Sequence, residues 1–102
     1  MLSKLEARKI GKKIFAEPQN LTSIFSALAD PGRFRIFKLL KEKKGICVSD
    51  VSSVLKISLQ AASQQLRILE MAGLVKKKRC GQMKCFEINN ENSKIKSILK
   101  LL

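Results

Sequence analysis

The chain has 102 residues, enough for one small domain with a modest hydrophobic core but too few for two domains. Its formal net charge is +13, from 21 Lys and Arg against 8 Asp and Glu, which favours a polyanionic partner. Histidine, suitably spaced carboxylate pairs and a glycine-rich phosphate loop are all absent, so we expect no enzyme, no catalytic residues and no cofactor.

Residues 3–16 predict a first helix, with Leu5 on a ragged apolar side among dense lysines. A short second helix follows the break at Pro18, with Thr22 or Ser23 as its cap. No apolar run is long enough to span a bilayer, and the charges of the first segment are scattered, unlike those of a signal peptide. These patterns predict a cytoplasmic protein.

Asp30 and Pro31 predict the start of a central helix, because they supply an N-cap followed by proline at the first helical position. Ser49 and Ser58 are predicted to cap two further helices, the second of which stops at Gly73. A tight turn between these two helices indicates a helix-turn-helix over residues 49–73.

After Gly73 the hydrophobic period changes to that of two strands, which predicts a β-hairpin over residues 74–88. Residues 93–102 then predict a last helix. The fold class is therefore mainly α (α+β), a single winged helix-turn-helix domain over residues 1–102 with a two-stranded wing and terminal helices. The last helix has an apolar stripe with no remaining core to enter, so we expect it to form an interface. The stripe consists of Ile95, Ile98, Leu99 and Leu102.

The helix that starts after Ser58 has a polar face without a carboxylate, made by Gln60, Ser63, Gln64 and Arg67. Amide, hydroxyl and guanidinium groups can read base edges in a major groove. A solvated polar surface is the competing interpretation. Between Val51 and Phe86 the only acid is Glu70, which favours a nucleic-acid partner for this half of the chain.

The segments F-S-A-L-A-D-P-G-R-F-R-I-F-K-L-L and S-L-Q-A-A-S-Q-Q-L-R-I-L-E-M-A-G-L-V, with the wing around Gly81, resemble the ArsR-type winged-helix transcriptional repressors. The resemblance covers Phe25 to Ile88, and the terminal helices match the family's dimerisation elements by position only. It implies a homodimeric repressor that binds a double-stranded DNA operator and releases it when an inducer, unknown here, binds.

Family pattern and helical geometry together predict DNA contacts from the second helix of the helix-turn-helix and from the wing. The residues are Ser58, Gln60, Ala61, Ser63, Gln64, Arg67, Arg79, Gln82 and Lys84. Ala61 is available to a thymine methyl, whereas Arg67 and the wing residues are suited to phosphates or a minor groove. Gln65 lies at the rim of the inward face, where packing explains it. The predicted dimer interface adds Leu5 to the stripe of the last helix.

The best-known members of the family bind a metal ion through two cysteines spaced Cys-Val-Cys. Here the segment is Cys47-Val48-Ser49-Asp50, with one thiol, and the last helix has none of the histidines or carboxylates of the family's second site. We therefore expect no metal site.

Cys47, Cys80 and Cys85 leave two interpretations open. Cys47 is explained as a small buried apolar residue, and the two wing cysteines can be incidental. Alternatively, the protein is a redox-responsive repressor that uses Cys80, Cys85 or Cys47, and basic neighbours lower the pKa of the two wing thiols. For the function of the whole chain, a further alternative is a winged helix that binds RNA or another protein. The acid-free polar face of the helix after Ser58 favours base recognition instead.

Overall fold

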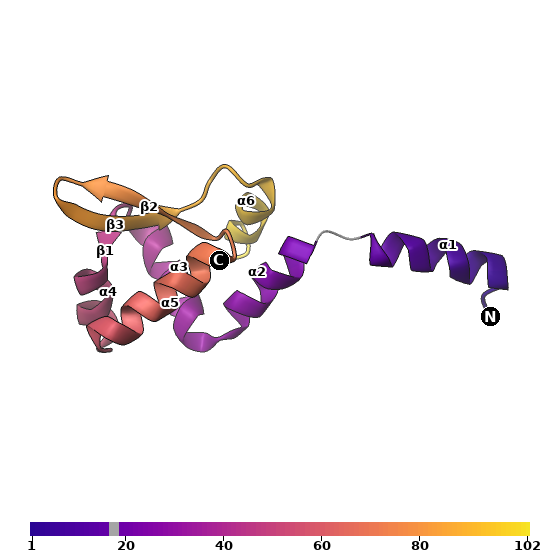
Figure 1. Cartoon of the computed structure of the whole chain (residues 1–102), viewed down its shortest axis with the longest axis horizontal. Coiled ribbons are helices and arrows are strands. Elements are labelled where there is room, and N and C mark those ends of the chain that lie inside the picture. Colours follow the sequence, from indigo (N-terminus) through magenta and orange to yellow (C-terminus); the bar gives the residue numbers. More distant parts are fainter. Residues whose placement is uncertain (17–18) are drawn as a thin grey trace.

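The computed structural model describes residues 1–16 and 19–102, without the side chains of residues 19 and 20. Helices α1 to α5 and the first strand occupy the first two thirds of the chain, and a hairpin and a last helix follow (Figure 1). The elements are α1 (Lys4–Phe15), α2 (Gln19–Ala29), α3 (Pro31–Glu42), β1 (Ile46–Cys47), α4 (Val48–Leu55), α5 (Leu59–Met71), β2 (Val75–Cys80), β3 (Met83–Ile88) and α6 (Ser93–Leu99). The predicted winged helix-turn-helix fold is confirmed, and the predicted break at Pro18 lies outside the described residues.

Local capping signals fix several of these boundaries. The Asp30 carboxylate accepts a hydrogen bond from the Arg33 backbone N–H at 3.0 Å, and Pro31 is the first residue of α3, as predicted. The Ser58 hydroxyl accepts from the Ala61 N–H at 3.0 Å and starts α5 in the same way.

Three predicted boundaries are wrong. Helix α2 already begins at Gln19, so Thr22 and Ser23 lie inside it rather than at its N-cap position. Helix α4 has Cys47 at its N-cap position, with Ser49 in the first turn. Helix α6 ends at Leu99 rather than at residue 102.

The wing belongs to a three-stranded antiparallel sheet in the order β1-β3-β2, so the short strand before α4 adds a third strand to the predicted hairpin. Arg79 lies opposite Lys84 on the β2 side of β3, and Cys47 lies opposite Cys85 on its β1 side. Gly81 turns the hairpin with a φ of +64°, a conformation that favours glycine.

The core lies where α3, α5 and the sheet meet. The inward face of α5 is formed by Ala62, Leu66 and Leu69, which are fully buried. They pack in one cluster with Phe37 of α3 and Ile95 of α6. Ile95 was predicted to lie in an interface outside the core. It is instead 0% exposed and belongs to the core.

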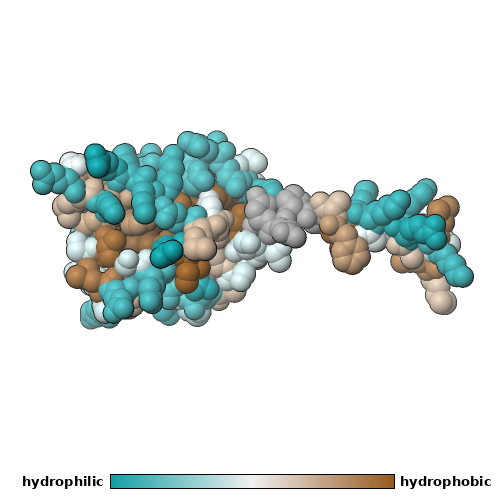
Figure 2. Space-filling model, viewed as in Figure 1, coloured by the Kyte–Doolittle hydropathy of each residue, from teal (hydrophilic) through white to brown (hydrophobic). Residues whose placement is uncertain are grey.

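Helix α1 lies apart from this body (Figure 1). It has a capping box between Ser3 and Glu6 but no buried residue. Figure 2 shows hydrophobic and hydrophilic residues side by side on its surface. Leu5, Ile14 and Phe15 are 61%, 62% and 91% exposed, so this helix has apolar surface that its own protomer does not cover.

Candidate nucleic-acid interface

A three-residue turn sets the angle between α4 and α5. Lys56 ends α4 with a φ of 56°, the left-handed conformation that non-glycine residues rarely adopt. The Ile57 N–H donates to the Ser52 carbonyl at 3.1 Å, and the Ser52 hydroxyl donates to the Ile57 carbonyl at 2.5 Å. These two hydrogen bonds hold the turn, and the Ser58 cap then directs α5 away from α4.

The polar face of α5 is solvent-accessible along its first three turns. The side chains of Gln60, Ser63, Gln64 and Arg67 are all exposed, as a base-reading surface requires. Ala61 is half-buried and lines a hollow of about 130 Å³ between α3, α4 and α5, so its methyl group is only partly available. Ser58 is exposed, but its hydroxyl is already engaged as the helix cap.

The polar face is not free of carboxylate at its far end. Glu70 lines the same open hollow of about 410 Å³ as Ser63 and Arg67, between α5 and the wing. Its carboxylate lies 3.8 Å from the Lys77 ammonium group, which neutralises it. The predicted face of Gln60, Ser63, Gln64 and Arg67 therefore has a paired carboxylate, Glu70, directly beyond its last residue.

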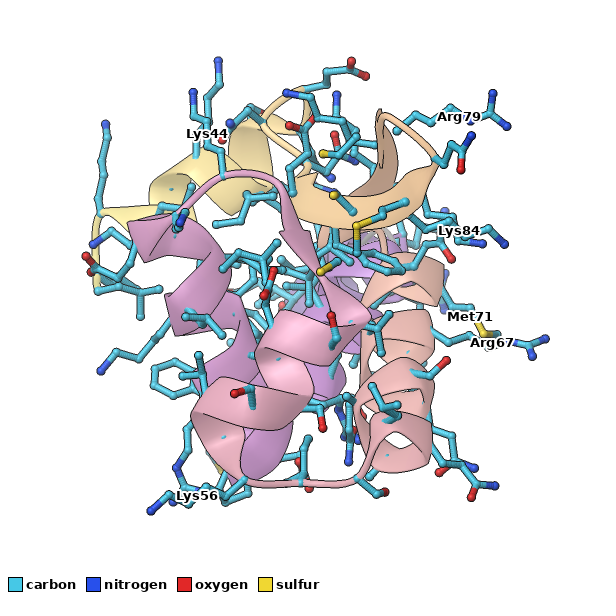
Figure 3. All side chains as sticks on the ribbon, turned by 90° about the vertical axis from the view of Figure 1, so that its left-hand side faces the viewer. Lys44, Lys56, Arg67, Met71, Arg79 and Lys84 are labelled. Carbon is cyan, nitrogen blue, oxygen red and sulfur yellow. The ribbon has the colours of Figure 1, made fainter. Side chains whose placement is uncertain are left out.

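The cations of the wing and of the adjoining face of α5 fall into two groups. Lys76 and Lys78 pair with Glu87 at 3.7 and 3.6 Å, and Lys77 pairs with Glu70. Arg67, Arg79 and Lys84, in contrast, make no ion pair with any described residue. We call these three the free cations. They project from the same side of the molecule, one from α5 and two from the wing (Figure 3).

Arg33 connects three helices behind the polar face. Its Nε donates to the Ala27 carbonyl of α2 at 2.8 Å, and its Nη1 donates to the Gln65 side-chain oxygen of α5 at 3.1 Å. The predicted packing role of Gln65 therefore leaves out its main polar contact. Two residues that lie 32 positions apart give no local sequence signal for such a bond.

The predicted interface residues divide by burial. Ile95 has no surface left for a partner, whereas Ile98, Leu99 and Leu102 are half-buried against the core of their own protomer. The Leu102 carbonyl also accepts a hydrogen bond from Lys41 at 2.8 Å, which holds the end of the chain against α3. Leu5 alone among them is well exposed.

The cysteines differ in environment. Cys85 is 4% exposed, Cys47 is half-buried and Cys80 is exposed. A hydrogen bond with Cys80 and burial raise the pKa of Cys85 to about 11, opposite to the lowering expected from the basic wing. The Cys47 thiol donates to the Asp50 carboxylate at 2.9 Å, so it is more than an apolar filler, and this bond lowers the pKa of Asp50.

Metal-binding clusters and membrane spans are both missing from residues 1–16 and 19–102. No three His, Cys, Asp or Glu residues in these ranges are arranged to hold a metal ion. None of the described helices is both long and apolar enough to cross a membrane.

Helices α4 and α5 followed by the β2–β3 wing define a winged helix-turn-helix DNA-binding domain. Residues 28–78 match a family model described as a helix-turn-helix domain. The chain is 42% identical over 66 residues to a transcriptional repressor SmtB homolog of Synechocystis sp., covering 65% of this chain and 49% of that protein. It is 34% identical over 84 residues to an uncharacterized helix-turn-helix transcriptional regulator of Methanocaldococcus jannaschii, covering 82% and 92%.

The solution structure of a homodimeric winged helix-turn-helix DNA-binding domain of Mycobacterium bovis, a possible ArsR-family regulator, has the same fold. Its TM-score is 0.72 at 23% identity, over 99% of this chain and 83% of that one. This chain belongs to the ArsR-type family of helix-turn-helix transcriptional regulators. It spans about half the length of the Synechocystis relative.

Proposed function

We propose that this protein is a homodimeric repressor that recognises operator DNA with α5 and binds the phosphate backbone with the free cations. The observation that carries the proposal is the combination, on one side of the molecule, of an exposed polar helix face and three cations that make no ion pair with any described residue. If carboxylates were paired with these cations, the fold alone would explain their charges. Arg67, Arg79 and Lys84 have no such pair among the described residues.

Base recognition is assigned to Gln60, Ser63 and Gln64. Gln60 and Gln64 lie one helical turn apart, so both can address neighbouring base pairs from a single major groove. A glutamine amide can form two hydrogen bonds with an adenine edge, and a serine hydroxyl can pair with several bases. Ser58 and Ala61, at the start of α5, are assigned supporting contacts because one is engaged as the cap and the other is half-buried.

Phosphate binding by the wing explains an unfavourable feature of its structure. Arg79 and Lys84 are like charges placed directly opposite each other, an arrangement that costs stability in an isolated hairpin. A phosphate between them would relieve the repulsion. Exposed Gln82, in the turn beyond them, is positioned to reach the adjacent groove.

The homodimer is supported by the uncovered apolar surface of α1 and by the homodimeric state of the Mycobacterium bovis domain. A two-fold dimer would present α5 twice, to half-sites roughly 34 Å apart. Repression rather than activation is supported by the likeness to the Synechocystis protein, a transcriptional repressor homolog. We propose no metal inducer, because the position of the family's second cysteine is occupied by Ser49.

The test is the ratio of the affinity for DNA upstream of the protein's own gene to the affinity for random DNA, at one salt concentration. Gln64→Ala should lower operator affinity by on the order of 1 to 3 kcal/mol per half-site and leave random-sequence affinity almost unchanged. Ser53→Ala, at an exposed position of α4, is the matched control and should change neither.

Two results would contradict the proposal. An equal loss on both DNA molecules would make Gln64 a general surface residue rather than a base contact. Equal competition by tRNA and by operator DNA would favour an RNA-binding module instead.

A further inference from the structure

We propose that Cys80 and Cys85 form a peroxide-responsive dithiol, whose oxidation to a disulfide distorts the wing and weakens operator binding. This inference rests on the proposed function and assigns a means of regulation to the same DNA-binding surface.

The strand register brings the cysteines to one face of the sheet. Cys80 lies opposite Met83, and Cys85 is two residues further along β3, so Cys80 and Cys85 are diagonal neighbours on the same face. Cys47 shares this face because it lies opposite Cys85 on the other side of β3. A side-chain carbon added at Gly45 would lie 3.6 Å from Cys80 Sγ, so this thiol is folded back over the chain before β1.

The two thiols have complementary environments. Cys80 is exposed and accessible to a small oxidant, whereas Cys85 is 4% exposed and shielded from it. The strand register places the buried thiol diagonally next to the accessible one across β2 and β3. Cys47 is held differently, by its bonds to Asp50 and Ser49 at 2.9 and 3.1 Å.

The chemistry balances with a hydroperoxide as oxidant. The Cys80 thiolate attacks the O–O bond, and Cys80 becomes a sulfenic acid while the peroxide is reduced to an alcohol or, from hydrogen peroxide, to water. The Cys85 sulfur then attacks the Cys80 sulfur, the S–O bond breaks, and the departing hydroxide takes the Cys85 proton as water. Two thiols are oxidised to one disulfide, and one peroxide is reduced.

Bond formation requires the wing to change shape. Diagonal neighbours in an antiparallel pair have Cα atoms about 7–8 Å apart, whereas a disulfide usually holds its Cα atoms within about 6.8 Å. The strands must therefore move at the Arg79–Lys84 pair, which lies between the two cysteines in the ladder. These are two of the three free cations, so oxidation displaces the proposed phosphate contacts.

The test uses the full chain, reduced and then treated with hydrogen peroxide, with peptide mass mapping after thiol blocking. Trypsin cleaves after Arg79 and Lys84 and so places Cys80 and Cys85 on separate peptides, which remain linked only if the disulfide has formed. We expect that linked pair, together with a roughly 5- to 150-fold loss of operator affinity that a reducing agent reverses. Cys80→Ser should abolish both effects, whereas Cys47→Ser, the matched control, should retain both.

A linkage through Cys47, a linkage between two chains, no linkage at all, or a disulfide that leaves operator affinity unchanged would each overturn the proposal. Cys80 is exposed, so Cys80→Ser should fold normally even if changes at buried Cys85 do not. If the reduced protein does not prefer its operator, the proposed function fails. The peptide map, which involves no DNA, still decides whether the dithiol forms the bond.

Discussion

Neighbouring cations of the wing differ in whether a carboxylate or another cation lies next to them. Lys78 is paired with Glu87 at 3.6 Å, whereas Arg79, the next residue, faces Lys84 across the ladder. Because strand residues alternate between faces, Lys78 and Arg79 point to opposite sides of the sheet. Two adjacent positions of similar chemistry therefore have different charge environments.

This difference predicts the salt dependence of DNA binding. Arg79→Ala should reduce the slope of log affinity against log salt by about 0.9 for each phosphate that the variant no longer neutralises, on every DNA sequence alike. Lys78→Ala removes the same formal charge from the same strand but should leave the slope nearly unchanged. Titrations of both variants over a range of salt concentrations measure this, and equal slopes for the two would refute the assignment of Arg79.

Cys85 predicts a pH dependence of stability. Its pKa is raised to about 11 from an ordinary 9.0, first by the hydrogen bond with Cys80 and then by burial. Below 9.0 the thiol is neutral in both folded and unfolded chains, so its contribution to stability is fully present. As the pH rises from 9.0 to about 11, only the unfolded chain ionises, and the free energy of unfolding falls.

Denaturant unfolding under reducing conditions, at pH values below and within this window, measures the decline. Cys85→Ala is the control, because it differs from the original chain only in lacking this thiol. A decline of the same size in the variant would show that Cys85 does not cause it.

At the scale of elements, Arg33 fixes α5 relative to α2 and α3. Arg33→Lys keeps the charge but loses the planar fork that donates to Ala27 and Gln65 together. We expect a loss of about 1.5–3 kcal/mol in stability and a larger loss of affinity for operator than for random DNA. Chemical unfolding and the affinity ratio measure the two effects, with exposed Arg35→Lys as the control. A loss of stability with an unchanged ratio would limit Arg33 to a structural role.

The elements also show which predictions local sequence can support. Asp30-Pro31, Ser58 and Gly81 act within one turn of chain, so the starts of α3 and α5 and the hairpin were predictable from them. The apolar stripe of α6 reveals which face is buried, but not what covers it, and so the burial of Ile95 in its own core was missed. The pairing of β1 with β3 and the bond from Arg33 to Gln65 join distant segments, and no local pattern encodes them.

At the scale of the whole molecule, the apolar surface of α1 predicts that the proposed dimer depends on this helix. Ile14 is 62% exposed, and an aspartate there would be buried without a partner in any interface that covers this surface. We expect Ile14→Asp to shift the dimer towards monomer in sedimentation or light scattering. Lys13→Asp, at an exposed neighbouring position, is the control and should remain dimeric. If both variants stay dimeric, α1 is not the interface.

The isolation of α1 also links its conformation to protein concentration. A helix of 12 residues without buried side chains is only marginally stable in water, and its capping box contributes little beyond the first turn. If dimerisation covers it, dilution below the dissociation constant should unwind it while the winged domain stays folded. Circular dichroism on serial dilution would then show a partial loss of helical signal, and operator occupancy would fall more steeply than for a preformed dimer. The first helix would thereby make repression a threshold response to the amount of protein in the cell.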